Sequence, residues 1–360
     1  MILMSLRYRD VLKDIAPYVP GKPISDVQRE LGLSEVIKLA SNENPFGFSS
    51  KVEKALKDAF SELPLYPDGN STVLREKLAE KHGLNPEQFV FGAGSNEIIT
   101  LIAQIFLEPG DESIFADPSF VWYDTAVRVS GAKPVVIPLK EYTHDLEAMK
   151  NAITDKTRII WVCNPNNPTG TIVTKQQLEE FIDSVPGNIV IVLDEAYYEY
   201  ARGGDYPETV PLLEKYPNLI ILRTFSKAYG LASLRVGYGM ASAEMVSYLN
   251  RIRPPFNVNT LAQVAAVAAL DDQDFVNNTV TETKKGLEFL YGAFDRLNLH
   301  YVRSYANFVW VETKLSSQEL FKKLLTRGVI IRPFMGNWVR ITVGTPEQNR
   351  LLVHAMEEVL

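Results

Sequence analysis

The sequence predicts an α/β protein, with a large domain built on a mostly parallel β-sheet between helices and a smaller α+β domain after it. Short runs that are apolar at every position recur between helical patterns, which is typical of strands buried on both faces of a parallel sheet. Strands and helices alternate until about residue 255, where the pattern changes. The chain has 360 residues, more than one domain usually contains. We expect an arm over 1–40 that packs on the small domain, the large domain over 41–255, and a long linking helix with the small domain over 256–360.

Individual elements follow from local patterns. The candidate strands of the large domain are "SIFAD" (113–117), "PVVIP" (134–138), "RIIWVC" (158–163), "NIVIVLD" (188–194) and "LIILR" (219–223). Ser/Thr starts and helical apolar spacing predict helices over 70–83 and 174–185. Further on, we expect a helical region over 259–298, a strand at 307–313, a helix near 316–327, and two strand-like segments, "GVIIRPF" and "WVRITVG". Ligands of such a sheet bind at the carboxyl ends of its strands.

Composition narrows the class of protein. The net charge of −7 and pI near 5.4 argue against nucleic acid as the main partner. Cys163 is the only cysteine, so no internal disulfide can form, which suits a reducing cytosol. The N-terminal "MILMSLRYRDVLKD" has too short an apolar run for a signal peptide, and 261–270 is too short to cross a bilayer. We therefore expect a cytoplasmic protein with no membrane partner and no metal site.

Two polar motifs follow candidate strands and have both a plain and a functional interpretation. In "FGAGSNEII" (91–99) the glycines allow tight turns, and the free N–H groups of Ser95 and Asn96 would point at an anion, although a loop without a ligand has the same pattern. In "CNPNNPTG" (163–170) two prolines and a glycine impose a rigid turn. Its asparagines either cap that turn or reach a ligand oxygen.

Two further motifs carry ionisable groups. Asp194 in "LDEAYYEY" stands at the mouth of a buried strand, where it either caps the next helix or pairs with a cationic ligand nitrogen, and Tyr197 could bond a neighbouring oxygen. In "TFSKAYGLASLRVGYG" (224–239) Lys227 is a solvated loop lysine or a buried amine with a lowered pKa. A free amine adds to an aldehyde to form a Schiff base. Thr224, Ser226 and Arg235 would then bind a phosphate.

Taken together, the four motifs describe one ligand. It carries an aldehyde, a phosphate, a ring nitrogen that needs an acidic partner and a ring oxygen that needs an amide and a phenol. These are the groups of pyridoxal 5′-phosphate, and the order of glycine turn, asparagine turn, Asp-x-x-Tyr, Ser-Lys and Arg places each requirement once.

The ordered set resembles the fold-type I pyridoxal-phosphate-dependent aminotransferases, and "TFSKAYGLAS" resembles the lysine pattern of class II. A closer likeness, to the histidinol-phosphate aminotransferase family, covers essentially the whole chain. It rests on "YVPGKPISDVQRELGLSEVIKLASNENPFG", "LYPDGNSTVLREKLAE", "CNPNNPTG", "VLDEAYYEY", "RTFSKAYGLASLRVGYG" and "VRITVGTPEQN". The resemblance implies exchange of an amino group between histidinol phosphate (imidazole acetol phosphate) and glutamate or 2-oxoglutarate, in L-histidine biosynthesis.

The resemblance also implies roles for matching residues. The catalytic residues would be Lys227, which carries the cofactor and shuttles the proton, Asp194, which keeps the pyridine nitrogen protonated, and Tyr197. Asn167 and Tyr197 would bind the phenolic oxygen, and Phe120 would stack on the ring. The phosphate would be bound by Ser95, Asn96, Thr224, Ser226 and Arg235. Tyr66 would reach the cofactor phosphate of the partner subunit, so the resemblance implies a homodimer with shared active sites.

The substrate end would be formed by Arg332, Arg340 and Asn42, because arginine pairs bidentately with phosphate and carboxylate alike. The segment "PFMGNWV" between the two arginines is shorter than in many relatives, and its Trp338 is expected to affect how the substrate ring is held. Three alternatives stay open: an aromatic (Phe/Tyr) aminotransferase, a threonine-phosphate decarboxylase, and a non-enzymatic ligand-sensing regulator. The negative charge and the lack of room for a DNA-binding domain before "KLASNENP" speak against the last.

Overall fold

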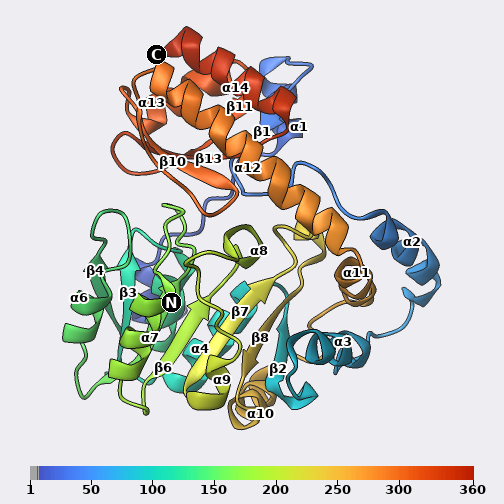
Figure 1. The fold of residues 1–360 in the computed structure, drawn as a ribbon, viewed down its shortest axis with the longest axis vertical. Coiled ribbons are helices and arrows are strands. Elements are labelled where there is room, and N and C mark those ends of the chain that lie inside the picture. The colour runs from blue at the N-terminus through green and yellow to red at the C-terminus, as the bar shows by residue number, and fades with distance from the viewer. Residues whose placement is uncertain (1–5, 7) are drawn as a thin grey trace, which may run out of the picture.

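A computed structural model describes residues 6 and 8–360. The other residues belong to the N-terminal stretch that argues against a signal peptide, so that expectation lies partly outside the described residues. Figure 1 shows two layered parts: a large sheet with helices on both sides, and a C-terminal part that includes the red and orange helices. Helix α12 (Gln273–Arg296) runs from one part to the other.

The large sheet has seven strands, and one strand runs against the others. In spatial order these are β2 (Phe89–Gly92), β8 (Gly237–Ala241), β7 (Leu219–Thr224), β6 (Val190–Asp194), β5 (Thr157–Cys163), β3 (Glu112–Asp117) and β4 (Lys133–Pro138). Strand β8 pairs antiparallel with both β2 and β7, whereas β7, β6, β5, β3 and β4 pair in parallel. The predicted α/β class with a mostly parallel sheet is therefore confirmed.

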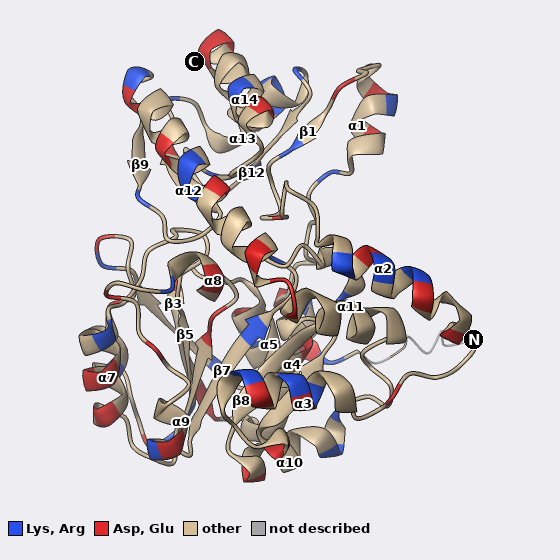
Figure 2. Cartoon of the chain, turned by 45° about the vertical axis from the view of Figure 1, so that its right-hand side comes forward, with Lys and Arg blue, Asp and Glu red and all other residues tan. Residues whose placement is uncertain are grey.

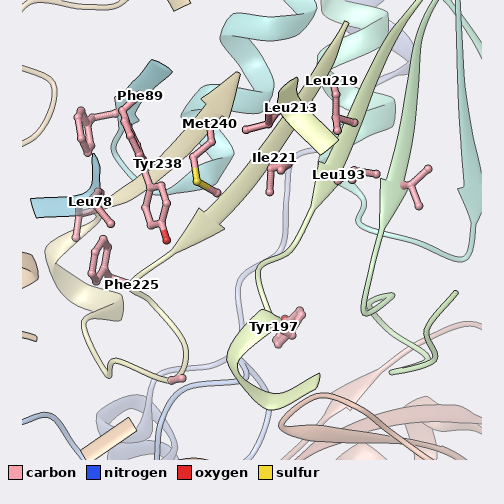
Figure 3. Packing of buried hydrophobic residues seen from close by; sticks show 14 of the residues in the cluster. Leu78, Phe89, Leu193, Tyr197, Leu213, Leu219, Ile221, Phe225, Tyr238 and Met240 are labelled. Atoms are coloured by element: carbon pink, nitrogen blue, oxygen red, sulfur yellow. The ribbon is translucent and has the colours of Figure 1, made fainter. Parts of the chain in front are cut away.

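Both faces of the sheet are buried, which explains why the strands are apolar at every position. In β7, Leu219 and Ile221 face one core, and Ile220 and Leu222 face the other. Figure 3 shows Leu193, Leu219 and Ile221 on the first face, and Leu78 of α3 with Phe89 and Tyr238 in the same core. Alternate strand residues point to opposite faces, so each face needs its own layer of helices.

The helices around this sheet divide between the two cores. The first core includes residues of α2 (Ser50–Ala59), α3 (Thr72–His82), α6 (Leu146–Asn151), α7 (Lys175–Ser184), α8 (Tyr198–Ala201), α9 (Leu212–Lys215) and α11 (Thr260–Leu270). The second includes residues of α4 (Ser95–Phe106), α5 (Trp122–Ser130) and α10 (Ala243–Ile252). Basic and acidic residues both occur along α2, α3 and α7 (Figure 2), as is usual for solvated helices.

The C-terminal part has its own core. Its remaining elements are β9 (His300–Val302), β10 (Phe308–Glu312), α13 (Ser317–Leu325), β11 (Val329–Ile330), β12 (Arg332–Pro333), β13 (Trp338–Thr342) and α14 (Pro346–Val359). Strands β12, β13, β10 and β9 form an antiparallel sheet in that order. The N-terminal segment contributes α1 (Ile24–Leu31) and β1 (Ile37–Lys38), and β1 pairs in parallel with β11.

Some local expectations differ from the structure. The helical region expected over 259–298 is two helices, separated at 271–272, where the side chain of Asp272 caps α12 by accepting from Phe275 N. The helix expected from residue 70 begins at Thr72, and its first turn is capped by Asp68, which accepts from Thr72 N. Helix α11 follows residue 255 in the chain, yet it packs into the core of the large sheet. The domain boundaries expected at residues 40 and 255 therefore stay a prediction.

Two absences apply to the described residues alone. Among residues 6 and 8–360, no helix is long and apolar enough to cross a membrane. Within that same part of the chain, no cluster of His, Cys, Asp and Glu residues is arranged to hold a metal ion.

Candidate active site

A cavity of about 350 Å³ opens at the carboxyl ends of the central strands. Strands β6 and β7 end in Asp194 and Thr224, and both residues line it. Twelve of the residues predicted from the sequence do so: Asn42, Ser95, Asn96, Phe120, Asn167, Asp194, Tyr197, Thr224, Ser226, Lys227, Arg235 and Arg340. Parallel strands place their carboxyl ends at one edge of a sheet, so residues from distant motifs meet there.

Lys227 presents its amine to the cavity. Its Nζ donates to Ser41 O at 3.3 Å and lies 5.8 Å from the centroid of the Tyr197 ring. Burial, and then the charge of Arg340, lower the pKa of Lys227 to about 8. The amine is therefore partly free near neutral pH, as a nucleophilic lysine requires.

Asp194 is a buried carboxylate held by two donors. The Tyr123 hydroxyl donates to its Oδ2 at 2.7 Å, and Ala196 N donates to its Oδ1 at 3.2 Å. Burial raises the pKa of Asp194, while the Tyr123 hydrogen bond lowers it. A carboxylate in such surroundings suits a cationic partner.

Tyr123 was not predicted from the sequence. It lies in the first turn of α5, is fully buried, and stacks on Trp161 with centroids 5.0 Å apart. Phe120 lies edge-on to it at 5.5 Å. The only local signal is its place three residues after Phe120 in "DPSFVWYD", which puts both residues near the end of β3.

We expect Tyr123→Phe to reduce kcat/KM for amino transfer by about tenfold or more, because a hydrogen bond to a charged group is worth roughly 1.5–3 kcal/mol. The phenyl ring keeps the stacking on Trp161, so the melting temperature should change little. Steady-state kinetics and thermal unfolding measure both effects. Tyr206→Phe is the matched control, since it removes another buried hydroxyl, one that donates to Asn164 O at 2.6 Å. Equal losses in the two variants would contradict a specific role for Tyr123.

The opposite wall carries the groups predicted for a ring oxygen. Asn42 Nδ2 donates to Tyr197 Oη at 2.8 Å, and burial raises the pKa of Tyr197 to about 12. Arg340 Nη1 donates to Asn167 Oδ1 at 2.6 Å. Asn42 is itself held by Thr342, whose Oγ1 donates to Asn42 Oδ1 at 3.1 Å.

An anion-binding cup forms at the start of α4. Gly94 has φ +79°, and a Cβ added there would lie 2.4 Å from Arg235 Nη2. A Cβ on Gly237 would lie 2.4 Å from Ser95 N. Because glycine has no Cβ, both positions leave room for Arg235 and for the backbone N–H groups at the start of α4 to face a bound anion. Arg235 Nη1 donates to Ser226 Oγ at 3.3 Å, which aligns two predicted phosphate donors.

These features fit pyridoxal 5′-phosphate. Asn96 has a buried Oδ1 without a hydrogen-bond partner at the cup, so its amide is available to reorient toward a ligand. Arg235 supplies positive charge for a phosphate and Lys227 an amine for an aldehyde. Among the described lining residues Asp194 is the one carboxylate, and Phe120 offers a half-buried ring. The donor set therefore matches a ligand with one phosphate, one cationic nitrogen and one flat ring.

Two predicted residues do not line the cavity. Tyr66 is 82% exposed and stacks on Phe256 with centroids 4.8 Å apart. Arg332 lies beside the cavity, where its Nη1 donates to Val19 O at 2.8 Å and its guanidinium lies 5.5 Å from the Tyr18 ring centroid. Tyr18 does line the cavity, and no local pattern in the sequence signals this.

Trp338 belongs to an aromatic cluster of the C-terminal sheet. It stacks on Trp310 with centroids 5.2 Å apart and also contacts Tyr142 and His300. It is not among the residues that line the cavity of the described chain. The aromatic cluster of the C-terminal sheet takes up the Trp338 side chain, and its effect on how the substrate ring is held stays a prediction.

Known proteins resemble this chain over nearly its whole length. The family model "Aminotransferase class I and II" matches residues 34–356. The histidinol-phosphate aminotransferase of Caldicellulosiruptor saccharolyticus is 54% identical over 357 residues, 98% of this chain and 100% of that protein. Histidinol-phosphate aminotransferase 2 of Carboxydothermus hydrogenoformans is 48% identical over 98% of this chain and 99% of its own. The crystal structure of histidinol-phosphate aminotransferase from Sinorhizobium meliloti in complex with pyridoxal-5′-phosphate has a TM-score of 0.92 at 26% identity, covering 100% of this chain and 99% of that one.

Proposed function

Because the chain belongs to the class I and II aminotransferases and, among them, to the histidinol-phosphate aminotransferase family, we propose that it is a pyridoxal-phosphate-dependent histidinol-phosphate transaminase. It exchanges an amino group between histidinol phosphate and 2-oxoglutarate in L-histidine biosynthesis. The observation that carries the proposal is one cavity with Lys227, Asp194 and Arg340 on its walls. Turnover of histidinol phosphate and of phenylalanine, each with 2-oxoglutarate, tests the proposal.

Within this proposal each cavity residue has a physical task. When bound, the cofactor supplies an aldehyde and an electron-withdrawing ring that stabilises negative charge on the substrate. Lys227 would hold the cofactor through its Nζ, and when this amine is free it would carry the proton that leaves the substrate α-carbon. Asp194 keeps the ring nitrogen protonated, and Tyr197 and Asn167 hold the ring oxygen. Phe120 covers the ring, and the phosphate is held by Ser95, Asn96, Thr224, Ser226 and Arg235.

The substrate end combines two arginines in direct register. Arg332 of β12 and Arg340 of β13 are opposite one another in the antiparallel pair. Like charges directly across a sheet repel, and an anion between them relieves this cost. Arg340 is buried, and its Nε has no hydrogen-bond partner. This supports a substrate with a phosphate in one half-reaction and a second carboxylate in the other, with Asn42 completing the wall.

We expect Arg332→Ala to lower kcat/KM for histidinol phosphate by about one to two decades, since a charged hydrogen bond is worth roughly 1.5–3 kcal/mol. The loss for phenylalanine, which has no phosphate, should be smaller. The value of kcat/KM is measured for both substrates with the parent and with Arg332→Ala. Arg327→Ala serves as the control, because Arg327 pairs with Glu358 on the surface of the same part of the chain.

Equal losses for the two substrates would assign Arg332 to structure or to the common carboxylate. That result would favour the alternative function, an aromatic aminotransferase. Release of carbon dioxide from threonine phosphate by the parent protein would instead favour the decarboxylase.

We also propose a homodimer with shared active sites and a cytoplasmic location. An apolar edge, defined as Phe60, Leu63, Leu65, Tyr66 and Phe256, has side chains that are 45–82% exposed. A contiguous exposed apolar surface is typical of a protein–protein interface. The exposed Tyr66 ring supports its assignment to the partner's phosphate. The single buried cysteine suits a reducing compartment, and cell fractionation tests the location.

Shared sites predict complementation between two inactive variants. Lys227→Ala lacks the amine, and Tyr66→Ala lacks the residue lent to the partner. After subunit exchange, half the dimers should be mixed, and each mixed dimer should hold one intact site, so roughly a quarter of sites should recover. Activity after mixing, with exchange verified by mass spectrometry of differently tagged subunits, measures this. Exchange without recovery would contradict shared sites.

A further inference from the structure

A buried ion pair lies directly behind the cavity. The side chains of Arg223 and Glu195 are 3% and 1% exposed, and Arg223 Nε donates to Glu195 Oε2 at 2.8 Å. Thr209 Oγ1 donates to the other oxygen, Glu195 Oε1, at 2.6 Å. The guanidinium of Arg223 also lies 3.4 Å from the ring centroid of Tyr198. Glu195, Tyr198 and Arg223 therefore form one contact group, which we call the rear cluster.

Each member of the rear cluster is the sequence neighbour of a cavity-lining residue. The neighbouring pairs are Asp194 with Glu195, Tyr197 with Tyr198, and Thr224 with Arg223. At the end of β6 and in β7, consecutive residues point to opposite sides, and at the start of α8 Tyr197 lines the cavity while Tyr198 lies under Arg223. The contacts within the rear cluster thus connect the three segments that line the cavity, on the side away from the cavity.

One backbone and one side-chain hydrogen bond make this connection stiff. Glu195 N donates to Leu222 O at 2.8 Å, which ties the end of β6 to β7. Tyr198 Oη donates to Glu208 Oε2 at 3.2 Å, on the same loop as Thr209. A displacement of Arg223 would therefore be passed on to the ends of both strands.

Stability alone gives no reason for this arrangement. Replacing a buried ion pair by apolar groups of similar volume is often neutral or stabilising, whereas losing one partner leaves an unpaired buried charge. An arginine held by a charged hydrogen bond on one side and by an aromatic ring on the other instead defines angles and distances, since its planar guanidinium has fixed geometry.

We propose that Glu195, Tyr198 and Arg223 are positioning residues that set the placement of Asp194, Tyr197 and Thr224 around the bound cofactor. The inference rests on the proposed function, because it concerns the same site. Its consequence is that the rear cluster controls cofactor affinity and the titration of the bound cofactor without contacting the cofactor.

The test compares the parent with Glu195→Gln/Arg223→Met, which removes both charges at similar volume. The dissociation constant for pyridoxal 5′-phosphate, the pH midpoint of the absorbance of the bound cofactor, and the melting temperature of the cofactor-free protein are measured. We expect the dissociation constant to rise by about tenfold or more, as supporting groups of a site typically contribute. The pH midpoint should move, and the melting temperature should stay near that of the parent.

The control is Asp111→Asn/Arg158→Met, which removes an ion pair at the amino ends of the strands, where Arg158 Nε lies 3.2 Å from Asp111 Oδ1. A rear-cluster variant that matches both the parent and this control in affinity and pH midpoint would overturn the inference. Binding of pyridoxal 5′-phosphate by the parent protein, and its turnover of histidinol phosphate, test the proposed function separately.

A second pair of variants keeps the test decisive if the double variant does not fold. Tyr198→Phe retains the ring under Arg223 and should keep the parent's cofactor affinity and pH midpoint, whereas Tyr198→Ala should change both. Identical behaviour of these two variants would overturn the inference.

Discussion

Lys227→Ala should abolish covalent attachment of the cofactor and lower the rate of amino transfer by at least about 10⁴-fold, the upper range for proton transfer by a positioned group. The physical reason is that its amine is the one that lines the cavity, with a pKa lowered to about 8 by burial and by Arg340. Borohydride reduction of the loaded parent, followed by peptide mapping, should place the cofactor on the peptide that contains Lys227.

The lowered pKa gives this prediction a pH dependence. Below pH 8 the amine of Lys227 is mostly protonated and cannot attack an aldehyde, and above pH 8 it is mostly free. The rate of cofactor capture by the cofactor-free protein should therefore rise through about pH 8 and then level off. Stopped-flow absorbance measures the rate.

Lys81 provides a matched control for Lys227. Burial also lowers the pKa of Lys81, but its Nζ donates to Tyr229 Oη at 3.1 Å, and it does not line the cavity. Lys81→Gln should retain covalent attachment. Labelling of Lys81 or of any other lysine in the parent would contradict the assignment of Lys227.

The second large effect is expected for Asp194→Asn, which should lower kcat by about 10³-fold, the range for losing a preorganised electrostatic partner. A neutral amide does not hold a proton on the ring nitrogen, so the ring loses its ability to stabilise charge on the substrate. The phosphate cup at Gly94 and Arg235 is unchanged, so cofactor affinity should fall far less than the rate. Single-turnover kinetics and equilibrium binding separate the two.

Asp117 provides a control for the effect of Asp194→Asn on kcat. Asp117 ends β3, and burial raises its pKa, but it does not line the cavity. Asp117→Asn should leave kcat close to that of the parent. An Asp194→Asn protein with most of the parent's half-reaction rate would show that the ring nitrogen needs no acidic partner here.

Local sequence predicted much of the large sheet and of the cavity. Strand β7 was expected over 219–223 and spans Leu219–Thr224, because burial on both faces demands an apolar residue at every position. Asp194 and Lys227 were identified because each is an ionisable group placed at or just after the end of such a strand. By contrast, β8 was not predicted as a strand, since Gly237 and Gly239 conceal its pattern. Those glycines are required by neighbours distant in sequence, Ser95 and Val90.

The sequence by itself determined the fold class, the family and most of the residues that line the cavity, because each of these depends on local periodicity or on an ordered set of motifs. Only the tertiary structure decided what stands behind those residues. The contact of Tyr123 with Asp194, the register of Arg332 against Arg340 and the stacking of Arg223 on Tyr198 depend on how strands pair and how helices pack. These contacts form between segments that no local pattern relates, so their partners are found only when the chain is folded.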